Sequence, residues 1–300
     1  MLTDIGNPLG PAILASLDGI LAALRLRPAG DDRFRVPSEP GRLQDRVFGG
    51  QLLAQALLAA DATVSGKAPH SLHAAFVEAG APGRTVDLAV ERVRDGRSVS
   101  TRRVTVLQED RPRLVAIVSF HAGATEPDVH AAPPDVPRPE ELPLLQHWAQ
   151  ALPAEQREAG RSWIDRPPPL EMRIGEAPTF LGGASADGPR SHWMRLPRDI
   201  GDDRALHSAL LAYASDFLLM DMAFRSHPGG TGVGRLTGYS LDHALWLHRP
   251  VHFDRWHLHT QETIALTGDR GLTRGAIHDS DGRLVASVTQ EVLVRPLTAR

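Results

Sequence analysis

The chain has 300 residues, of which 42% are hydrophobic and 23% charged, which suits one large or two ordinary globular domains and excludes a wholly disordered polymer. Its net charge of −3 offers no basic excess for a nucleic-acid backbone, and the absence of cysteine excludes disulfides, thiolate metal sites and a cysteine nucleophile. Because no run of 18 apolar residues and no positively charged leader occurs, we expect a cytoplasmic protein with no membrane or nucleic-acid partner.

The first part of the chain predicts two helices with a loop between them. Residues 12–26 carry an apolar stripe at helical spacing, and residues 27–46 contain the prolines and glycines of a loop. A second helical pattern at 51–64 follows Gly49 and Gly50, which form its entry. The stripe of the first helix consists of Ile13, Leu17, Leu21 and Leu24.

The rest of the first half predicts an antiparallel sheet followed by a linker. Residues 72–121 contain strand-like segments separated by polar breaks, and residues 113–120 are apolar on both faces, as in a central strand. Residues 122–143 contain six prolines, which remove backbone donors and exclude a helix or a central strand. Residues 144–190 give no clear pattern.

The second half repeats the plan of the first. A helix is predicted at 205–224, and strands are predicted at 239–249, 256–267, 271–279 and 284–294. Two matches occur at one separation of 170 positions: His73 with His243, and Arg113-Leu114-Val115-Ala116 with Arg283-Leu284-Val285-Ala286. We therefore predict an α+β fold of two tandem helix-on-antiparallel-sheet units that pair edge to edge. The predicted boundaries are 10–121 for the N-terminal unit, 122–190 for the Pro-rich linker and lead-in, and 191–296 for the C-terminal unit.

Three positions differ in side-chain chemistry between the two copies and are therefore candidate site residues: Asp216, Ser240 and Gln290. A carboxylate within the apolar segment LLAYASDFLLM is unfavourable inside a helix and costly to bury without a partner. Satisfied structural polar groups would explain the same pattern, so both interpretations stay open at this point. The first-half counterparts of the three residues are Leu58, His70 and Phe120.

Ordered motifs over nearly the whole chain resemble the acyl-CoA thioesterase II family of double-hotdog hydrolases. The matching stretches are Val47-Phe48-Gly49-Gly50-Gln51, His70-Ser71-Leu72-His73, Arg94-Asp95-Gly96-Arg97-Ser98-Val99-Ser100, Tyr213-Ala214-Ser215-Asp216, Leu241-Asp242-His243 and Ala286-Ser287 with Gln290-Glu291. The resemblance implies a double hotdog that hydrolyses acyl-CoA thioesters to a free acid and CoA, with a role in lipid metabolism. Because no metal-ligand spacing such as H-E-x-x-H accompanies the histidines, we expect no metal or other cofactor.

The resemblance also implies which residues form the site. The catalytic Asp, Thr or Ser, and Gln of the family fall on Asp216, Ser240 and Gln290, with Ser240 in a place where similar members often have Thr. We expect these three residues, carried by the C-terminal unit, to hold a water, with Asp216 as its base or orienting group. Gly49 and Gly50 are expected to bind the substrate, since a helix start offers backbone N–H groups to a developing oxyanion.

Arginines near the mouth of the site are expected to bind the phosphates of CoA, and Arg249 and Arg274, with Arg102 and Arg103, are the candidates. His73 and His243, as matched positions, are expected to serve packing rather than chemistry. Two alternatives remain: a non-catalytic acyl-CoA-binding hotdog protein, and a hotdog hydratase acting on enoyl-CoA, which would need a close Asp–His pair. Exposed sheet edges predict a homo-oligomer.

Overall fold

The computed structural model describes residues 9–37, 46–123, 127–230 and 233–297. Strands β1 to β6 come from the first part of the chain: β1 (Arg27–Pro28), β2 (Arg33–Val36), β3 (Ala68–Phe76), β4 (Val86–Asp95), β5 (Val99–Gln108) and β6 (Arg111–His121). Strands β7 to β13 follow: β7 (Glu171–Ile174), β8 (Arg190–Arg195), β9 (Leu236–Ser240), β10 (Asp242–Leu247), β11 (His257–Thr267), β12 (Arg270–Asp279) and β13 (Leu284–Pro296).

The helices of the described residues are α1 (Gly10–Ala23), α2 (Gly49–Asp61), α3 (Leu145–Gln150), α4 (Arg157–Asp165), α5 (Arg204–Ser215) and α6 (Leu219–Ser226). Short 3₁₀ turns are η1 (Pro139–Glu141), η2 (Ala154–Gln156) and η3 (Thr179–Leu181). Within the described residues, no helix is long and apolar enough to cross a lipid bilayer.

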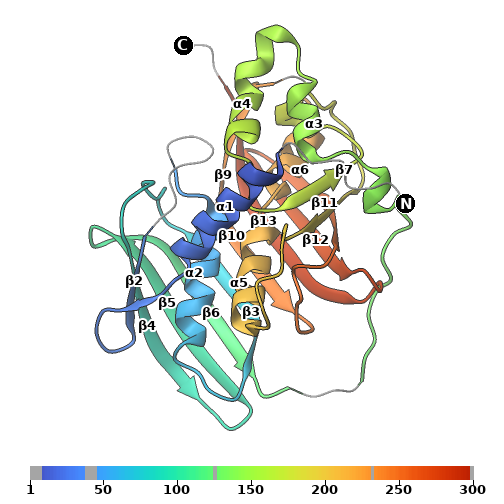
Figure 1. The fold of residues 1–300 in the computed structure, drawn as a ribbon. Helices are drawn as coiled ribbons and strands as arrows, with labels where there is room; N and C mark the ends of the chain where they lie inside the picture. Colours follow the sequence, from blue (N-terminus) through green and yellow to red (C-terminus); the bar gives the residue numbers. More distant parts are fainter. Residues whose placement is uncertain (1–8, 38–45, 124–126, 231–232, 298–300) are drawn as a thin grey trace.

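All of these strands join one antiparallel sheet of 13 strands in the order β1-β2-β4-β5-β6-β3-β10-β13-β12-β11-β8-β7, with β9 beside β13 (Figure 1). The two halves meet where β3 pairs with β10 and Leu72 lies opposite Leu245. The predicted α+β class, with two helix-on-sheet units joined edge to edge, is therefore confirmed.

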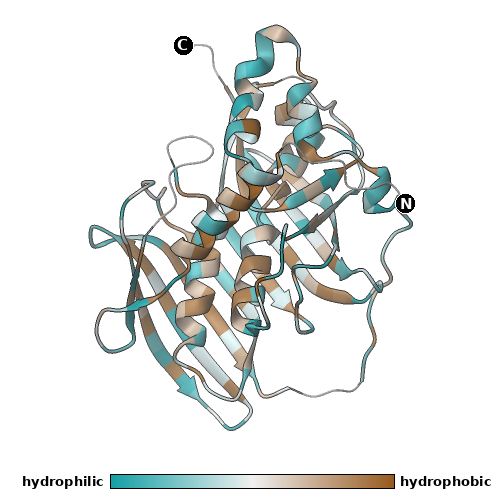
Figure 2. Cartoon of the chain, in the orientation of Figure 1, coloured by the Kyte–Doolittle hydropathy of each residue, from teal (hydrophilic) through white to brown (hydrophobic). Residues whose placement is uncertain are grey.

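Helices α2 and α5 lie side by side on one face of this sheet, and α1 crosses over them (Figure 1). Their apolar composition follows from this position, because the sheet covers one side of each helix and the neighbouring helices cover much of the rest. Every residue of α2 except Gly49, Leu58 and Asp61 is buried. Figure 2 shows the apolar residues gathered on these helices and on the strands beneath them.

One stretch predicted as a loop and one left without a prediction contain strands. The predicted loop at 27–46 holds β1 and β2, because Phe34 and Val36 turn toward the core while Arg33 and Arg35 face solvent. The unassigned stretch 144–190 contains α3, α4 and β7, and β7 adds an edge strand beside β8. Outside residues 124–126, the proline-rich stretch 122–138 is irregular, as expected.

The sequence predicted one helix at 205–224, whereas the structure has two helices with a break between them at the site. Helix α5 ends at Ser215, Asp216 is its C-cap residue, and Leu218 adopts a left-handed conformation with φ of 66° before α6 begins. Neither glycine nor proline marks this break, and the apolar pattern continues through it. The consequence is that the Asp216 side chain leaves the end of a helix rather than its middle.

The separation of 170 positions relates β6 to β13, but it does not relate β3 to β10. Ala116 and Ala286 are both buried and match at that separation. In the sheet, however, Ala116 pairs with Ala74 while Ala286 pairs with Leu247, so the structural counterpart of Ala74 is 173 positions away. An odd difference in strand register moves side chains to the other face of a sheet.

His73 and His243 are therefore not equivalent, contrary to the expectation from the repeat. His243 is buried on the face that carries the helices, whereas His73 lies on the opposite, exposed face with its ring 5.1 Å from that of Trp246. The strand predicted at 239–249 is also divided at Leu241 into β9 and β10, both of which pair with β13. This division places Ser240 at the end of β9.

Candidate active site

The start of α2 meets the end of α5, and Asp216 lies at this contact. The backbone N–H of Gly50 donates to Asp216 Oδ2 at 2.8 Å. A Cβ at Gly50 would lie 2.2 Å from the carbonyl oxygen of Tyr213, and one at Gly49 would lie 2.8 Å from Asp216 Oδ2. The glycine pair is therefore required by this close approach, which brings the positive end of the α2 dipole to the carboxylate.

The Asp216 carboxyl is 7% exposed, and burial raises its pKa above the ordinary value. The neighbouring His243, the Gly50 N–H and the Gln290 side chain each oppose that shift. Because its pKa is raised, the ionised Asp216 carboxylate is a stronger base than an exposed aspartate. General-base catalysis needs this property.

Gln290 and Ser240 complete a converging set of side chains from three segments. Gln290, on β13, is fully buried; its Nε2 donates to Ser240 Oγ at 2.9 Å, and its side chain lowers the pKa of Asp216. Ser240 is only half-buried, so it connects the buried pair to the surface. The structure thus brings together the three side chains that the sequence singled out.

His243 is a fourth member of this cluster that the sequence assigned to packing. Its Nδ1 lies 2.6 Å from Gln290 Oε1, and its Nε2 lies 3.0 Å from Ser215 Oγ. Burial lowers the pKa of His243, although the Asp216 carboxylate partly opposes this. Only the strand register reveals which of the two matched histidines faces the helices, so the repeat alone could not identify it.

The arginines proposed for CoA binding do not lie with this cluster. Arg249 follows the far end of β10, where its guanidinium donates to the Leu284 carbonyl and pairs with Asp128. Arg274 pairs with Glu262 on the exposed face of β11 and β12.

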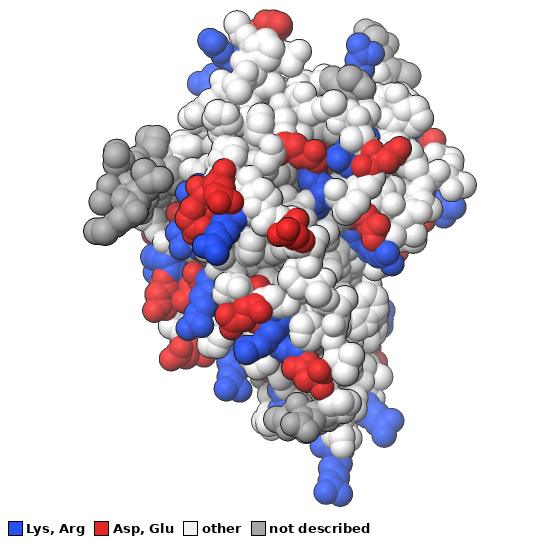
Figure 3. All heavy atoms as spheres, turned by 90° about the vertical axis from the view of Figure 1, so that its right-hand side faces the viewer, with Lys and Arg blue, Asp and Glu red and all other residues white. Residues whose placement is uncertain are grey.

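Arg102 and Arg103 are likewise held by other groups. Arg102 is fully buried and donates to Thr63 and Asp95. Arg103 pairs with Glu91 at the surface. On the face drawn in Figure 3, basic and acidic side chains lie close to one another, in keeping with such pairing.

Arg46 and Tyr239 form an exposed pair beside the cluster that the sequence analysis missed. The Arg46 guanidinium lies 4.3 Å from the centre of the Tyr239 ring, and Tyr239 is 44% exposed. Tyr239 directly precedes Ser240, and Arg46 precedes the Gly49–Gly50 entry of α2 by three residues. The two residues are 193 positions apart in sequence, so no local motif could have indicated their contact.

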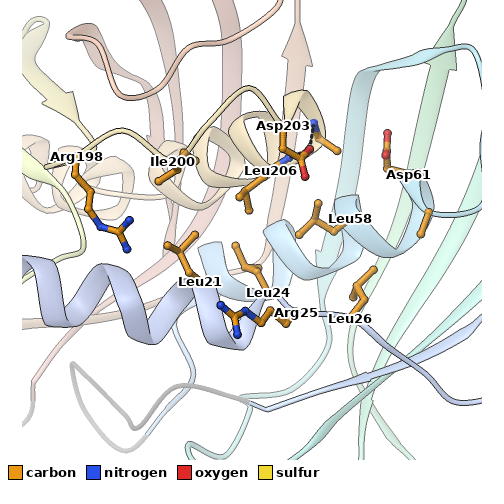
Figure 4. A pocket seen from close by; sticks show the side chains of 12 residues that line it. Leu21, Leu24, Arg25, Leu26, Leu58, Asp61, Arg198, Ile200, Asp203 and Leu206 are labelled. Carbon is orange, nitrogen blue, oxygen red and sulfur yellow. Dashed lines mark hydrogen bonds between the residues drawn. The ribbon is translucent and has the colours of Figure 1, made fainter.

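A cavity of about 570 Å³ lies at the opposite end of the α2–α5 pair and contains none of Asp216, Ser240 and Gln290 (Figure 4). Leucines of α1, α2 and the start of α5 line it, with Asp61 and Asp203 at one side. Burial and the charge of Asp203 raise the pKa of Asp61 to about 6. Asp61 and Asp216 are thus two perturbed carboxyls at opposite ends of one helix pair.

One side-chain group in the described residues has the composition of a metal site. His207, His252 and Asp254 place possible ligand atoms within 4.8 Å of one another. However, His207 Nδ1 accepts the Phe253 N–H at 3.0 Å, and its Nε2 lies 2.7 Å from the Gly201 carbonyl. Both nitrogens already have backbone partners, so the arrangement does not fit a bound ion.

Comparison with known proteins agrees with the fold and identifies the family. The sequence profile described as acyl-CoA thioesterase matches residues 164–293, and that described as acyl-CoA thioesterase N-terminal domain matches residues 37–121. The chain is 32% identical to acyl-coenzyme A thioesterase 8 of Rattus norvegicus, over 97% of this chain and 95% of the rat protein. It is 31% identical to acyl-CoA thioesterase 2 of Haemophilus influenzae, over 93% of this chain and 98% of that protein.

Solved structures give the same result. The acyl-CoA thioesterase II TesB2 of Mycobacterium marinum is 31% identical and superposes with a TM-score of 0.73, over 93% of this chain and 99% of that one. A tesB protein of Mycobacterium avium is 29% identical with a TM-score of 0.75, over 93% of this chain and all of that one. The chain therefore belongs to the acyl-CoA thioesterase II family of double-hotdog proteins.

Proposed function

We infer that this protein hydrolyses acyl-CoA thioesters to a free acid and CoA, as its family membership indicates, and we propose that Asp216, Ser240 and Gln290 hold the attacking water. The observation that carries the proposal is the cluster of these three side chains: Asp216 accepts from the Gly50 N–H, Gln290 donates to Ser240, and the Gln290 side chain lowers the pKa of Asp216. The proposed reaction uses no bound cofactor.

The proposed reaction uses Asp216 as the base. The water oxygen attacks the thioester carbonyl carbon while Asp216 accepts the water proton, and the C–S bond then breaks to release the CoA thiolate. A thiol pKa of about 8.5 makes this leaving group stable enough to depart without a strong acid. The proton taken by Asp216 returns to the thiolate or to solvent, so the carboxylate is regenerated.

Ser240 and the glycines have different roles in this scheme. Because Ser240 Oγ accepts a hydrogen bond from Gln290 Nε2, its own hydrogen is directed elsewhere, to the water or to the thioester carbonyl. The Gly50 N–H donates to Asp216, so we assign the oxyanion to the Gly49 N–H, which has no acceptor within α2. An amide cannot accept a proton, so Gln290 does not make Ser240 a nucleophile of the serine-hydrolase type.

For the phosphates and adenine of CoA, we propose the exposed pair of Arg46 and Tyr239 instead of Arg249 and Arg274. A guanidinium stacked on an aromatic ring offers hydrogen-bond donors to phosphate and a flat surface to a base. The pair lies next to Ser240 in the chain, whereas Arg249 and Arg274 already pair with carboxylates. We further propose a cytoplasmic location and a homo-oligomer joined through sheet edges.

Turnover of acyl-CoAs, followed by CoA release with a thiol-reactive dye, tests the proposed base. Asp216→Asn keeps the size of the side chain but removes the base, so we expect kcat to fall by about 10² to 10⁴. The matched control is Asp61→Asn at the other end of the same helix pair, which we expect to leave kcat unchanged. If Asp216→Asn retained wild-type turnover on every acyl-CoA that the wild type hydrolyses, the assignment would be wrong.

The pH profile gives a second test of the base. Because burial raises the pKa of Asp216, the carboxylate is lost on acidification at a higher pH than an ordinary aspartate with a pKa of 3.8. We therefore expect the acid limb of kcat/KM to lie above pH 3.8. A limb at or below that value would show that another group controls the reaction.

The two alternatives make different predictions. A non-catalytic acyl-CoA-binding protein would bind the same ligands without CoA release. A hydratase would consume the enoyl absorbance of enoyl-CoA and release no thiol. The hydratase is disfavoured because the histidine nearest Asp216 is His243, whose two nitrogens already contact Ser215 and Gln290.

A further inference from the structure

We infer that His243 is a positioning residue for the reaction, because its imidazole sets which end of the Gln290 amide faces Asp216 and Ser240. This inference rests on the proposed function, in which Gln290 helps to hold the water. His243 is not expected to touch the substrate. Its role is to give a buried amide one orientation out of two.

The first step is the location of the imidazole. His243 is 1% exposed and lies between Ser215, the last residue of α5, and Gln290 on β13. Its Nε2 lies 3.0 Å from Ser215 Oγ and its Nδ1 lies 2.6 Å from Gln290 Oε1. Both ring nitrogens therefore have partners, and the imidazole connects the end of α5 with the Gln290 amide on β13.

The second step is the direction of the amide. With Oε1 toward His243, Gln290 Nε2 donates to Ser240 Oγ, and the amide acts on the Asp216 carboxyl, whose pKa it lowers. The reversed amide would place a carbonyl oxygen against that carboxylate and remove the only donor that Ser240 receives from Gln290. Because Gln290 faces two acceptors, only the orientation that points its Nε2 toward them is favourable.

The third step is the tautomer of His243. For Gln290 Oε1 to accept a hydrogen bond, the proton of the imidazole has to be on Nδ1. Burial favours the neutral imidazole, so Nε2 carries no proton and accepts from the Ser215 hydroxyl. That hydroxyl has a single hydrogen, which also lies within reach of the Ala212 carbonyl at 2.9 Å. The donors then run in one direction, from His243 through Gln290 to Ser240.

Three variants separate this role from simple packing. His243→Ala removes the donor to Gln290, so we expect kcat to fall about 10-fold or more with KM within about 2-fold, the pattern for a lost orienting hydrogen bond. His243→Asn places an amide N–H near the position of Nδ1 and should restore most of the turnover. His243→Gln replaces Nε2 rather than Nδ1 and should not. His73→Ala, which changes the sequence-matched histidine on the opposite face, is the control and should match wild type.

A spectroscopic readout keeps the inference testable if a variant fails to fold. In ¹⁵N-histidine-labelled wild-type protein, we expect the His243 ring, assigned through its nuclear Overhauser contacts with Ser215 and Gln290, to be neutral with the proton on Nδ1. A proton on Nε2, or equal loss of kcat in the Asn, Gln and Ala variants, would overturn the inference.

Failure of the inference is distinguishable from failure of the proposed function. If Asp216→Asn and Gln290→Ala both retain wild-type turnover, the proposed water site is wrong. If those two variants lose turnover while His243→Ala keeps it, only the positioning role is wrong.

Discussion

Asp61 provides a quantitative test of the packing between α2 and α5. It is the last residue of α2, where a negative charge opposes the helix dipole, and it faces Asp203 at the start of α5. Within the described residues no ion pair to Asp61 is found. We predict that Asp61→Asn stabilises the protein near neutral pH.

The magnitude follows from the perturbed ionisation. A folded-state pKa of about 6 against 3.8 for an unperturbed carboxyl corresponds to about 3 kcal/mol of lost stability when the group is ionised in both states. Because Asp61 keeps partial contact with solvent, we discount this to about 1 to 2 kcal/mol. For a chain of this length the gain amounts to about 2 to 3 °C in Tm.

The sign depends on pH in a defined way. The folded state binds the proton more tightly, so wild-type stability contributed by this group is present below pH 3.8 and is lost as pH rises through about 6. The advantage of Asp61→Asn should therefore be full at pH 7.5 and small at pH 4, as measured by denaturant unfolding at both values. Asp135→Asn, at an exposed position in the proline-rich stretch, is the control. An equal gain at both pH values, or none at pH 7.5, would refute the reasoning.

Three further predictions concern named contacts. Gly50→Ala places a Cβ 2.2 Å from the Tyr213 carbonyl oxygen, so we expect a loss of about 1 to 3 kcal/mol in stability together with reduced kcat, measured by unfolding and by CoA release. Arg102→Met removes a fully buried guanidinium and leaves its partners unpaired, so a loss of about 3 to 5 kcal/mol is expected with KM for acyl-CoA unchanged in the folded enzyme. Arg46→Ala should raise KM for acyl-CoA, and less so for an acyl-pantetheine that lacks the nucleotide; equal KM changes for both would contradict contact of the Arg46–Tyr239 pair with the nucleotide.

Much of the fold was predictable because burial follows local periodicity. The alternation in residues 72–121 and the apolar stripes of 12–26 and 51–64 correspond to β3–β6, α1 and α2. Elements whose signals are short or mixed were missed, including β1 and β7, which form the two edges of the sheet, and β2 beside β1; these strands bury few side chains.

The candidate site was predictable in part, since a polar residue in an apolar segment stands out wherever the chain folds. Asp216 and Gln290 could be named because their counterparts in the first half are apolar, and Ser240 because it stands where the first half has a histidine. Arg249 and Arg274 were named from charge and approximate position alone, and charge alone does not indicate which carboxylate an arginine will meet.

The sequence by itself determined the duplicated α+β plan and the three unusual polar positions, because both depend on residue type and spacing along the chain. Only the tertiary structure decided that α5 ends at Asp216, that His243 rather than His73 faces the helices, and that Gly50 meets a carboxylate 166 residues away. Those features depend on strand register and on the packing of α2 against α5, and a shift of a single residue in register changes which face a side chain occupies.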